Sequence, residues 1–350
     1  MNPVRIGDRL VGLGQPSYII AEAGANHDRD LAIAHRLIDV AADCSADAVK
    51  FQTYSADTLY SRYTPRLREM DEFNRSPRGE TPHELIRRLE LPREWQRELR
   101  DHAVERDIDF LSTPFDLRAV EQLAALDVKA YKIASYDITY HSLIQAAGKH
   151  GRPVIISTGN SGLGDIEMAL AALSEVGNTQ TIVLHCVSQY PTRYEDLNMR
   201  TLQSLALAFD IPVGFSDHTM DSTAAILAVA LGACCFEKHF TLDRKRKGPD
   251  HPSALEPDEL GAYIQAIRNA ECALGSSVKR VQASEEENHR LARRSLHAAM
   301  DIPAGTVITP EMLIIKRPAL GIYPAHEQIV VGRTARRDIQ ADEWITWEMI

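Results

Sequence analysis

The sequence has few cysteines, and none at spacings that hold a zinc ion or mark a disulfide framework. Its five cysteines lie far apart or directly adjacent, at Cys44, Cys186, Cys234, Cys235 and Cys272, with no C-x-x-C motif. None is spaced with histidine as in a zinc finger. We therefore expect reduced thiols, mostly buried as small apolar side chains.

Long apolar runs are also missing. No stretch approaches the roughly 20 apolar residues that span a bilayer, and the N-terminal "MNPVRIGDRLVGLGQPS" lacks the apolar core of a signal peptide. We expect a cytoplasmic protein. Positive charge is in deficit, because 39 Lys and Arg against 49 Asp and Glu give a formal net charge of −10. This balance argues against nucleic acid or an anionic membrane as a partner, although a local basic pocket stays open.

Eight short apolar or β-branched segments recur along the first 240 residues. They are "YIIAEAG", "AVKFQT", "DFLSTP", "AYKIAS", "PVIIST", "TIVLHC", "PVGFSD" and "CCFEKHF". Segments with helical periodicity lie between them, such as "LAIAHRLIDVAAD", "REWQRELRDHAVER", "LRAVEQLAAL", "DIEMALAALSEV" and "STAAILAVALG". Strand and helix alternating eight times predict an α/β fold, a (β/α)8 TIM barrel over residues 1–275. The alternative, a doubly wound open sheet, usually carries G-x-G-x-x-G after its first strand, and "EAGANHD" has no such motif.

The pattern changes after residue 275. Residues 276–294 are highly charged with few apolar anchors, which indicates a linker or a solvated helix. Beyond them, "DIPAGTVITPEML" from Asp301 is echoed in register by "DIQADEWITWEMI" from Asp338. The echo predicts two related half-motifs in a small β-rich domain over residues 295–350. A domain of about 55 residues seldom supplies a large core, so we expect it to pack against another surface.

Polar side chains gather where the predicted strands end, and barrel enzymes carry their function at the carboxyl ends of the strands. Side chains two apart on a strand face the same way, so Lys50 with Gln52, and Glu237 with His239, can point into one mouth. A single Ser or Thr there is more commonly a turn or cap residue. Lysines in buried strands need an anion, so Lys50 and Lys132 favour a phosphate or carboxylate ligand. The other polar strand ends are Glu22, Ser112, Thr113, Ser135, Ser157, Thr158, His185, Ser188, Tyr190 and Ser216.

Two histidines, His218 and His239, stand at the ends of consecutive predicted strands. Each alone is as readily a hydrogen-bonded core imidazole as a ligand. Together they can share one divalent cation, with Glu237 or water completing its coordination. Such an open site suits Mn²⁺, with Mg²⁺ or Co²⁺ as alternatives, better than a closed structural zinc ion. The residues alone thus predict a metal-assisted barrel enzyme for an anionic, phosphorylated small molecule and leave its reaction open.

Nine motifs, in order along essentially the whole chain, resemble the sialic acid synthase family. They are "IIAEAGANHDRD", "DAVKFQTY", "FLSTPFD", "AYKIAS", "VIISTGN", "LHCVSQYPTRYEDLN", "GFSDHT", "FEKHFTLDRKRKGPDH" and "KRPALGIYP". Members of that family condense phosphoenolpyruvate with an N-acylated amino sugar aldehyde to form nine-carbon 3-deoxy-2-ulosonic acids. The resemblance implies a (β/α)8 barrel followed by an antifreeze-like (SAF) domain. It also implies a domain-swapped homodimer, in which the small domain of one subunit covers the barrel mouth of the other.

The resemblance further implies roles for individual residues. His218 and His239 would hold the metal, with Glu237 beside it as an orienting group or a base. Arg317 would reach the N-acyl group of the sugar from the partner subunit. Phosphoenolpyruvate would be held by Lys50, Thr113, Lys132, Ser135, Ser157 and Ser216, and the sugar by Glu22, Gln52, Tyr190 and Asp250.

Three residues depart from the family pattern. Asp137 stands where several members have Glu, near C3 of phosphoenolpyruvate, and we expect it to be catalytic with an open role. Ser188 stands where some members that use N-acetylmannosamine have Asn, and we expect it to contact substrate. Ala319 replaces the usual Gly beside Arg317.

The motif "GPDHPSALEPDEL" is similar to the neuraminate and legionaminate branches of the family, whereas the pseudaminate branch commonly lacks the GPDH run. We expect an N-acetylneuraminate synthase that uses N-acetylmannosamine. Legionaminic acid synthase, or a related spore-coat polysaccharide synthase, is the alternative. Two interpretations outside the family stay open: a metal-free aldolase with a Schiff base on Lys132 or Lys50, and a carbohydrate-binding or scaffold protein.

Overall fold

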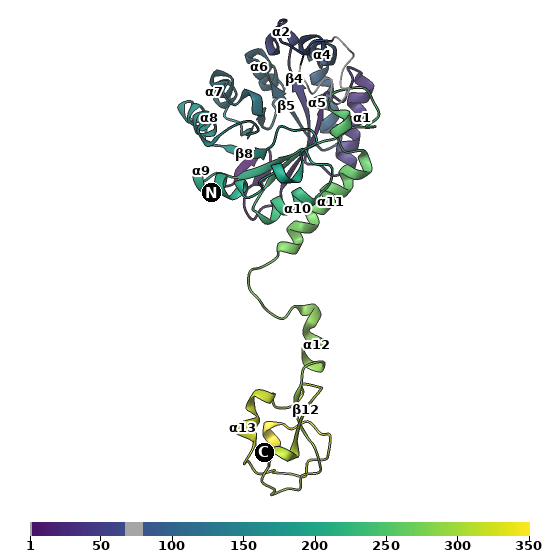
Figure 1. Ribbon diagram of the computed structural model, residues 1–350, viewed down its shortest axis with the longest axis vertical. Helices are drawn as coiled ribbons and strands as arrows, with labels where there is room; N and C mark the ends of the chain where they lie inside the picture. Colours follow the sequence, from purple (N-terminus) through teal and green to yellow (C-terminus); the bar gives the residue numbers. More distant parts are fainter. Residues whose placement is uncertain (1, 67–79) are drawn as a thin grey trace. The chain divides into compact units, whose positions relative to one another are not determined.

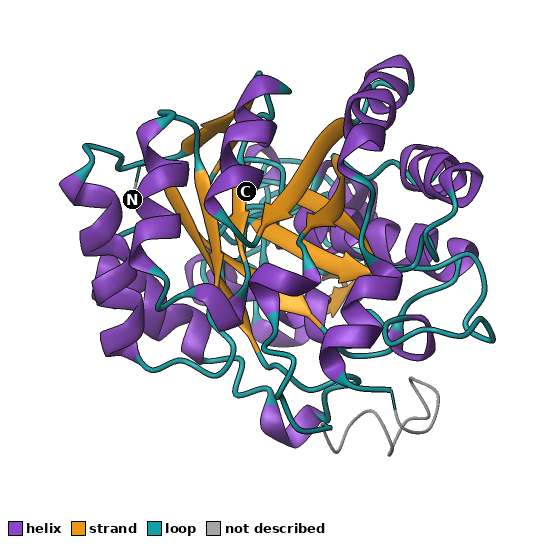
Figure 2. Ribbon diagram, turned by 90° about the horizontal axis from the view of Figure 1, so that it is seen from above, coloured by secondary structure: helices purple, strands orange, loops and turns teal. Residues whose placement is uncertain are grey.

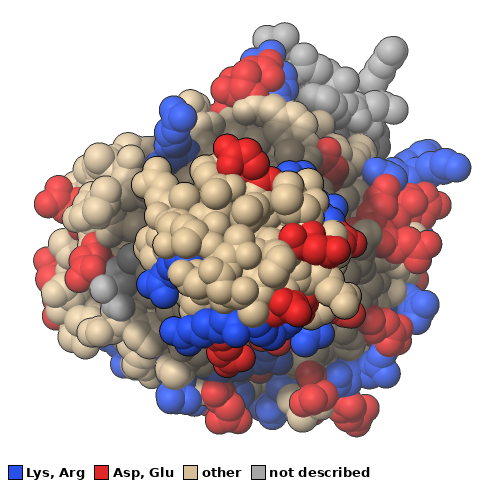
Figure 3. Space-filling view, turned by 90° about the horizontal axis from the view of Figure 1, so that it is seen from below, with Lys and Arg blue, Asp and Glu red and all other residues tan. Residues whose placement is uncertain are grey.

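The computed structural model describes residues 2–66 and 80–350, and Figure 1 labels its helices and strands. The chain divides into two compact units, residues 1–275 and 276–350. Among the described residues, no helix is long and apolar enough to cross a membrane. Acidic and basic side chains lie next to one another on the face shown in Figure 3.

The first unit is built on a parallel sheet whose strands all fall on predicted segments. They are β3 (Tyr18–Gly24), β4 (Ala48–Thr53), β5 (Asp109–Pro114), β6 (Tyr131–Ile133), β7 (Val154–Ser157), β8 (Thr181–Cys186), β9 (Val213–Asp217) and β10 (Cys235–His239). Their hydrogen-bonded order is β5-β4-β3-β10-β9-β8-β7-β6. The two strands at the ends of this order, β5 and β6, also contact each other, so the sheet forms a nearly closed barrel. The predicted α/β barrel is confirmed, and Figure 2 shows its strands surrounded by helices.

Helices cover the outside of the barrel (Figure 1). Those on periodic segments are α1 (Leu31–Asp43), α5 (Gln96–Glu105), α6 (Leu117–Ala125), α8 (Leu163–Glu175) and α10 (Thr223–Ala230), and α11 (Pro257–Leu274) follows the last strand. In α1 the Asp30 side chain caps two backbone N–H groups at the start of the helix, and the buried residues Ala34, Leu37, Ile38 and Ala41 share one face. The helices that the sequence analysis did not identify are α2 (Ala56–Leu59), α4 (Pro82–Leu89), α7 (His141–Lys149) and α9 (Thr201–Phe209).

An N-terminal hairpin, which the sequence analysis also missed, closes one end of the barrel. Its strands β1 (Val4–Ile6) and β2 (Arg9–Val11) pair antiparallel. Val4, Ile6 and Val11 pack in one buried cluster with residues from the beginnings of the barrel strands, such as Ile20 and Ile182. The amino-terminal end of the barrel is thus filled by apolar side chains.

The inward side of the strands changes character along the barrel axis. On β3 the buried Ile20 belongs to the apolar cluster, and Glu22 lies two residues further along. On β4, Ala48 is followed in the same way by Lys50, and on β10 Cys235 is followed by Glu237. Because side chains two apart share a face, the apolar layer passes into a buried polar layer towards the carboxyl ends of the strands. That layer is where the candidate site lies.

The second unit begins with an exposed stretch that contains a short helix, α12 (Glu286–Leu291). Its folded part has one antiparallel ladder, between β11 (Ser295–Ala298) and β12 (Leu313–Lys316), and a further helix, α13 (Glu327–Val330). The 3-10 turns of this unit are η5 (Ala283–Glu285), η6 (Pro310–Met312), η7 (Pro324–His326) and η8 (Trp347–Met349).

The two predicted half-motifs pair with each other inside this small unit. Ile302 and Ile339 exchange backbone hydrogen bonds of 2.8 and 2.9 Å. The aspartate before each isoleucine accepts a backbone N–H from the other half: Asp301 from residue 341, and Asp338 from residue 304, both at 2.7 Å. The echo in the sequence therefore corresponds to a reciprocal contact. Both isoleucines lie in the apolar core of the unit.

Candidate active site

Four charged side chains from separate strands meet inside the barrel. Lys50 Nζ lies 2.7 Å from Glu22 Oε2 and 3.6 Å from Glu237 Oε1, and Lys132 Nζ lies 3.6 Å from Glu237 Oε2. All four are at most 5% exposed. Two lysines and two glutamates thus form one buried chain of alternating charge, in which Glu237 lies between the two ammonium groups. Such a layer is costly to bury and is more typical of a binding site than of a structural core.

Polar neighbours surround this chain of charges. Lys50 Nζ donates to Thr113 Oγ1 at 3.1 Å, and Gln52 Nε2 donates to Glu22 Oε1 at 2.8 Å. The residues from β3, β4 and β5 predicted at the mouth are therefore brought together.

The two glutamates have opposite pKa shifts. Burial raises the pKa of Glu22 to about 7, although Lys50 opposes the shift. Burial would raise the pKa of Glu237 too, but the ammonium groups of Lys132 and Lys50 outweigh it and hold that pKa well below its usual range. At neutral pH Glu237 is ionised, and Glu22 readily holds a proton. Two carboxyl groups with separated pKa values are a common acid and base pair in enzymes.

The two lysines also differ. The Glu22 and Glu237 carboxylates outweigh the effect of burial and raise the pKa of Lys50. Burial lowers the pKa of Lys132, and Glu237 only partly offsets it. Lys50 therefore keeps its positive charge to a higher pH than Lys132 does.

Three predicted serines gather around one glycine. Gly159 N donates to Ser135 Oγ at 2.9 Å. A Cβ atom added to Gly159 would lie 2.1 Å from Ser188 Oγ and 3.0 Å from Ser135 Oγ. Ser157, at the end of β7, lies two residues before this glycine. Hydroxyl groups held this close together suit the oxygens of a phosphate or carboxylate.

Several buried polar atoms of this region have no hydrogen-bond partner in the part of the chain that the structure describes. They include Ser157 Oγ, Ser188 Oγ, Asp137 Oδ2, Glu237 Oε2 and His239 Nδ1. Unsatisfied buried polar atoms are costly and uncommon in folded proteins. Their concentration at one end of the barrel fits a polar ligand.

His218 and His239 come together at the ends of β9 and β10, with ring centroids 5.6 Å apart. The Tyr190 ring lies against both, at 4.0 Å from His218 and 5.7 Å from His239. His218 Nδ1 donates to the backbone oxygen of Val187 at 2.7 Å, which leaves the Nε2 lone pair for a ligand. Burial lowers the pKa of His239 to about 4, so its imidazole is neutral near pH 7, as metal binding requires.

Burial would lower the pKa of His218 too, but the neighbouring Cys186 outweighs burial and raises that pKa, so a cation would compete with a proton for this imidazole. The donor set fits a divalent cation held by two imidazole nitrogens. No group of three or more His, Cys, Asp or Glu that could hold a metal occurs among residues 2–66 and 80–350. A cation here would depend on water or substrate for its remaining ligands, as an open catalytic site does.

Asp250 approaches the same corner from the loop after β10. Its Oδ2 accepts the backbone N–H of Ala25 at 3.2 Å and lies 4.0 Å from His239 Nδ1. A Cβ at Gly24 would lie 2.7 Å from this oxygen and 3.5 Å from both Glu22 Oε1 and His239 Nδ1. Glu22, His239 and Asp250 thus converge on a glycine with a φ of +52°, a conformation that favours glycine.

Three predicted residues remain, and each lies in a different part of the structure. Ser216 is buried on β9, opposite Glu237 in the ladder. Asp137 is half-buried in a 3-10 turn after β6, and burial raises its pKa to about 6 against the opposing effect of Lys132. Arg317 belongs to the second unit and is exposed there.

The sequence analysis missed three residues of the site. Gly24 and Gly159 make room for the polar groups, and their signal was a glycine at or just after a strand end. Cys186, treated there as an inert apolar residue, lies with its sulfur 4.0 Å from His218 Nδ1. Its signal was its position two residues after the inward-facing Leu184. All five cysteines are free thiols, and three are buried, as expected.

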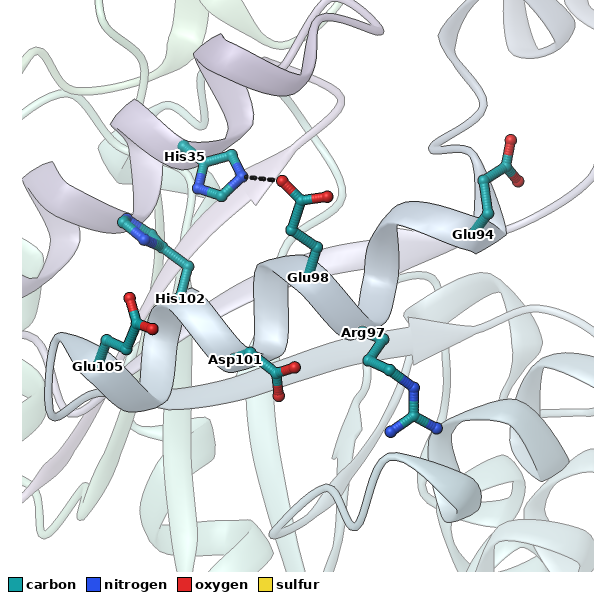
Figure 4. A pocket seen from close by; sticks show the side chains of 7 residues that line it. All are labelled: His35, Glu94, Arg97, Glu98, Asp101, His102 and Glu105. Carbon is teal, nitrogen blue, oxygen red and sulfur yellow. Dashed lines mark hydrogen bonds and ion pairs between the residues drawn. The ribbon is translucent and has the colours of Figure 1, made fainter.

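A separate hollow of about 400 Å³ lies outside the barrel, between α1 and α5. Figure 4 shows the seven side chains that line it, among them His35 and His102. The two imidazoles pair with carboxylates, His35 with Glu98 and His102 with Asp39, both at 3.0 Å. The hollow contains none of the converging residues at the strand ends.

The family model described as the NeuB family matches residues 37–279. The chain belongs to the NeuB family. A second match, to the SAF domain over residues 293–350, confirms the expected antifreeze-like domain. The resemblance found in the motifs is therefore confirmed.

Individual relatives match over nearly their whole length. An uncharacterized protein of Methanocaldococcus jannaschii is 40% identical over 99% of this chain and 98% of its own. The N,N'-diacetyllegionaminic acid synthase of Campylobacter jejuni is 40% identical over 93% and 98%. Other relatives, 33 to 38% identical, are named as legionaminic, pseudaminic and N-acetylneuraminate-9-phosphate synthases.

The fold agrees with that of a solved synthetase. The N-acetylneuraminic acid synthetase of Leptospira borgpetersenii has a TM-score of 0.72 at 34% identity, over 82% of this chain and 95% of that one. The chain is thus an enzyme of the same transferase type as these synthases, which excludes a purely structural or scaffold role.

Proposed function

We propose that the protein condenses phosphoenolpyruvate with an N-acylated amino sugar aldehyde and releases phosphate to form a nonulosonic acid. The observation that carries this proposal is the buried layer in which Lys50 and Lys132 alternate with Glu22 and Glu237 beneath two histidines. It provides cationic groups for an anionic substrate, and a pair of imidazoles, in one barrel mouth. Membership of the NeuB family supports the same reaction.

The two lysines and the serines hold phosphoenolpyruvate. Lys50, beside Thr113, and Lys132 neutralise its carboxylate and phosphate, while Ser135, Ser157, Ser188 and Ser216 donate hydroxyl groups. Glu22, Gln52, Tyr190 and Asp250 contact the sugar near His239. A bound divalent cation, Mn²⁺ in this proposal, would be held by His218 and His239 and would polarise the sugar aldehyde.

The reaction forms a carbon–carbon bond at C3 of phosphoenolpyruvate, and at C2 it forms a carbon–oxygen bond to water and breaks the carbon–oxygen bond to phosphate. C3 of phosphoenolpyruvate attacks the aldehyde carbon, and the aldehyde oxygen becomes a hydroxyl group by taking the proton held on Glu22. Water adds to the cationic C2, and Glu237, which is ionised, accepts its proton. The tetrahedral intermediate then expels phosphate as C2 becomes a ketone, the proton of its hydroxyl group leaves with the phosphate, and Lys50 and Lys132 stabilise the charge of that leaving group. Asp137, whose pKa burial raises against the opposing charge of Lys132, is proposed to lie near C3 of phosphoenolpyruvate.

The identity of the preferred sugar substrate is a separate part of this proposal. N-acetylmannosamine was the expectation from the sequence, and the likeness to the Leptospira synthetase supports it. The named legionaminic acid synthases reach 38 and 40% identity, against 34% for that synthetase. We therefore propose 2,4-diacetamido-2,4,6-trideoxymannose as the preferred substrate, with N-acetylmannosamine as the second candidate.

The deciding assay measures phosphate release from phosphoenolpyruvate with Mn²⁺ and each sugar in turn, followed by the product mass. We expect kcat/KM to be higher with the diacetamido sugar. A higher value with N-acetylmannosamine would make the protein an N-acetylneuraminate synthase, and release with neither sugar would contradict the proposed substrate class.

We propose the metal-dependent condensation rather than a Schiff base on Lys132, although burial lowers the pKa of this lysine, as imine-forming lysines require. Borohydride reduction in the presence of pyruvate, followed by mass spectrometry, separates the two. We expect no adduct. A covalent adduct on Lys132 would contradict the proposed metal-dependent condensation and would indicate a Schiff-base mechanism.

We also propose a cytoplasmic homodimer in which Arg317 of one subunit reaches the sugar of the other. Its exposed position in the second unit supports a role in binding. The test mixes two inactive variants, Arg317→Ala and His218→Ala, under conditions that exchange subunits. Hybrid dimers should regain activity at the one site with both residues intact, and a mixture that stays inactive despite exchange would contradict the swapped arrangement.

A further inference from the structure

A second buried ionic cluster lies on the outer side of the strands that carry the two histidines. Asp217 ends β9, and Lys238 is the penultimate residue of β10. The two residues are opposite each other in the parallel ladder. Lys238 Nζ lies 3.5 Å from Asp217 Oδ2, and their side chains are 1% and 0% exposed.

This pair faces the helix layer. Tyr263 of α11 donates its hydroxyl to Asp217 Oδ2 at 3.0 Å, and Lys238 Nζ lies 5.2 Å from the centre of the Tyr263 ring. Neighbouring side chains alternate along a strand, so Glu237 and His239 face the interior on either side of Lys238. The cluster is therefore placed to act on the histidines from the side opposite the substrate.

Thr219, the residue after His218, joins the cluster to that histidine. Asp217 Oδ1 accepts both the backbone N–H and the hydroxyl of Thr219 at 2.8 Å, which fixes a tight turn around His218. Lys238 Nζ donates to the backbone oxygen of the same threonine. Asp217 precedes His218 in the chain, Lys238 precedes His239, and both side chains bind Thr219. The ends of β9 and β10 are thus linked through this one residue.

Stability alone does not explain this arrangement. Burying a lysine and an aspartate costs free energy that their attraction recovers only in part, and apolar residues of similar volume often serve as well or better. Buried polar pairs are best attested where they set a register or a geometry. Here the geometry is the separation of the two strand ends.

We propose that Asp217, Lys238 and Tyr263 are positioning residues that hold His218 and His239 at the separation at which one divalent cation binds both. The inference rests on the proposed function, since it takes the two histidines to be the metal ligands. Groups that orient metal ligands commonly contribute roughly 10- to 100-fold to metal affinity.

The test measures Mn²⁺ binding to the full-length protein by titration calorimetry, without phosphoenolpyruvate or sugar. Lys238→Met keeps an unbranched chain and removes the charge, and its Kd for Mn²⁺ should rise roughly tenfold or more. Tyr263→Phe removes a single hydroxyl and should raise the Kd by a smaller factor. In both variants kcat should recover as Mn²⁺ approaches saturation, which a general loss of structure would not allow.

Arg268→Met is the matched control. Arg268 of α11 also pairs with a buried aspartate, Asp47, at 2.9 Å. Asp47 directly precedes β4, however, and neither histidine is on that strand. This variant should lose thermal stability and keep the wild-type Kd. An unchanged Kd in Tyr263→Phe and in folded Lys238→Met would overturn the inference, and Tyr263→Phe alone decides if Lys238→Met does not fold. Wild-type protein that binds no Mn²⁺ would instead remove the metal site of the proposed function.

Discussion

The ammonium group of Lys50 lies 2.7 Å from Glu22 Oε2, with almost no exposure to water. A buried pair of this kind contributes little net stability, because desolvation of the two charges offsets much of their attraction. The pair instead keeps a cation and a carboxyl group ready at the same place. Activity and stability should therefore respond differently when it is altered.

Lys50→Met should abolish phosphate release and lower the free energy of unfolding by on the order of 3 kcal/mol, because a buried carboxylate loses its partner. The double variant Lys50→Met, Glu22→Gln removes that uncompensated charge. It should regain most of the stability and none of the activity. Chemical denaturation and the phosphate assay measure the two effects.

The surface variant Lys129→Met serves as the control for Lys50, because its only described ion pair, with Asp127 at 3.4 Å, is half-exposed. It should leave both properties within experimental error of wild type. Substantial turnover by Lys50→Met would show that Lys50 does not hold substrate.

His218→Ala and His239→Ala should each lose Mn²⁺-dependent turnover by a factor of at least about 10³, since one imidazole cannot hold the cation alone. The fold should stay intact by circular dichroism. His150→Ala is the control, since His150 caps the end of α7 and pairs with Glu121 at 3.5 Å. Wild-type kcat in either histidine variant at limiting Mn²⁺ would exclude the proposed metal site.

Gly159→Ala should raise the KM for phosphoenolpyruvate by about tenfold, the equivalent of one lost hydrogen bond of roughly 1.4 kcal/mol. The added methyl group would occupy the place of the Ser188 hydroxyl, 2.1 Å away. Gly164→Ala, with no atom within 4 Å of its new Cβ, tests the same substitution without a clash. Equal KM values for phosphoenolpyruvate in the two variants would show that the serines around Gly159 do not bind this substrate.

The free energy of unfolding should vary with pH through the titration of Asp137. Burial raises its pKa from 3.8 to about 6, so the folded state binds this proton more tightly than the unfolded state. The stability that Asp137 contributes is thus fully present below its unfolded pKa and is lost as pH rises through about 6. Asp137→Asn should remove a decline on the order of 2 kcal/mol between pH 4 and pH 6.5, after allowance for its partial exposure. Superimposable curves of Tm against pH for the two proteins would contradict this assignment.

The barrel strands were largely predictable because each is a short apolar run, and burial on both faces of a parallel sheet requires such runs. The helices α7 and α9 were not identified, since neither segment shows a long enough apolar period to stand out from its surroundings. The N-terminal hairpin escaped notice for a related reason. Its three-residue strands acquire their role only by packing in one cluster with residues distant in the chain, such as Cys234 and Cys235.

The sequence by itself determined the alternation that creates the barrel, the polar strand ends and the family. It also placed Lys50, Lys132, His218 and His239 at one mouth, because the carboxyl ends of parallel strands meet at one edge. Only the tertiary structure decided the pairing of Lys50 with Glu22, the opposite pKa shifts of Glu22 and Glu237, and the tie between Asp217 and Lys238. These depend on distances of 2.7 to 3.6 Å between side chains of different strands, and on the burial that strengthens charge interactions there.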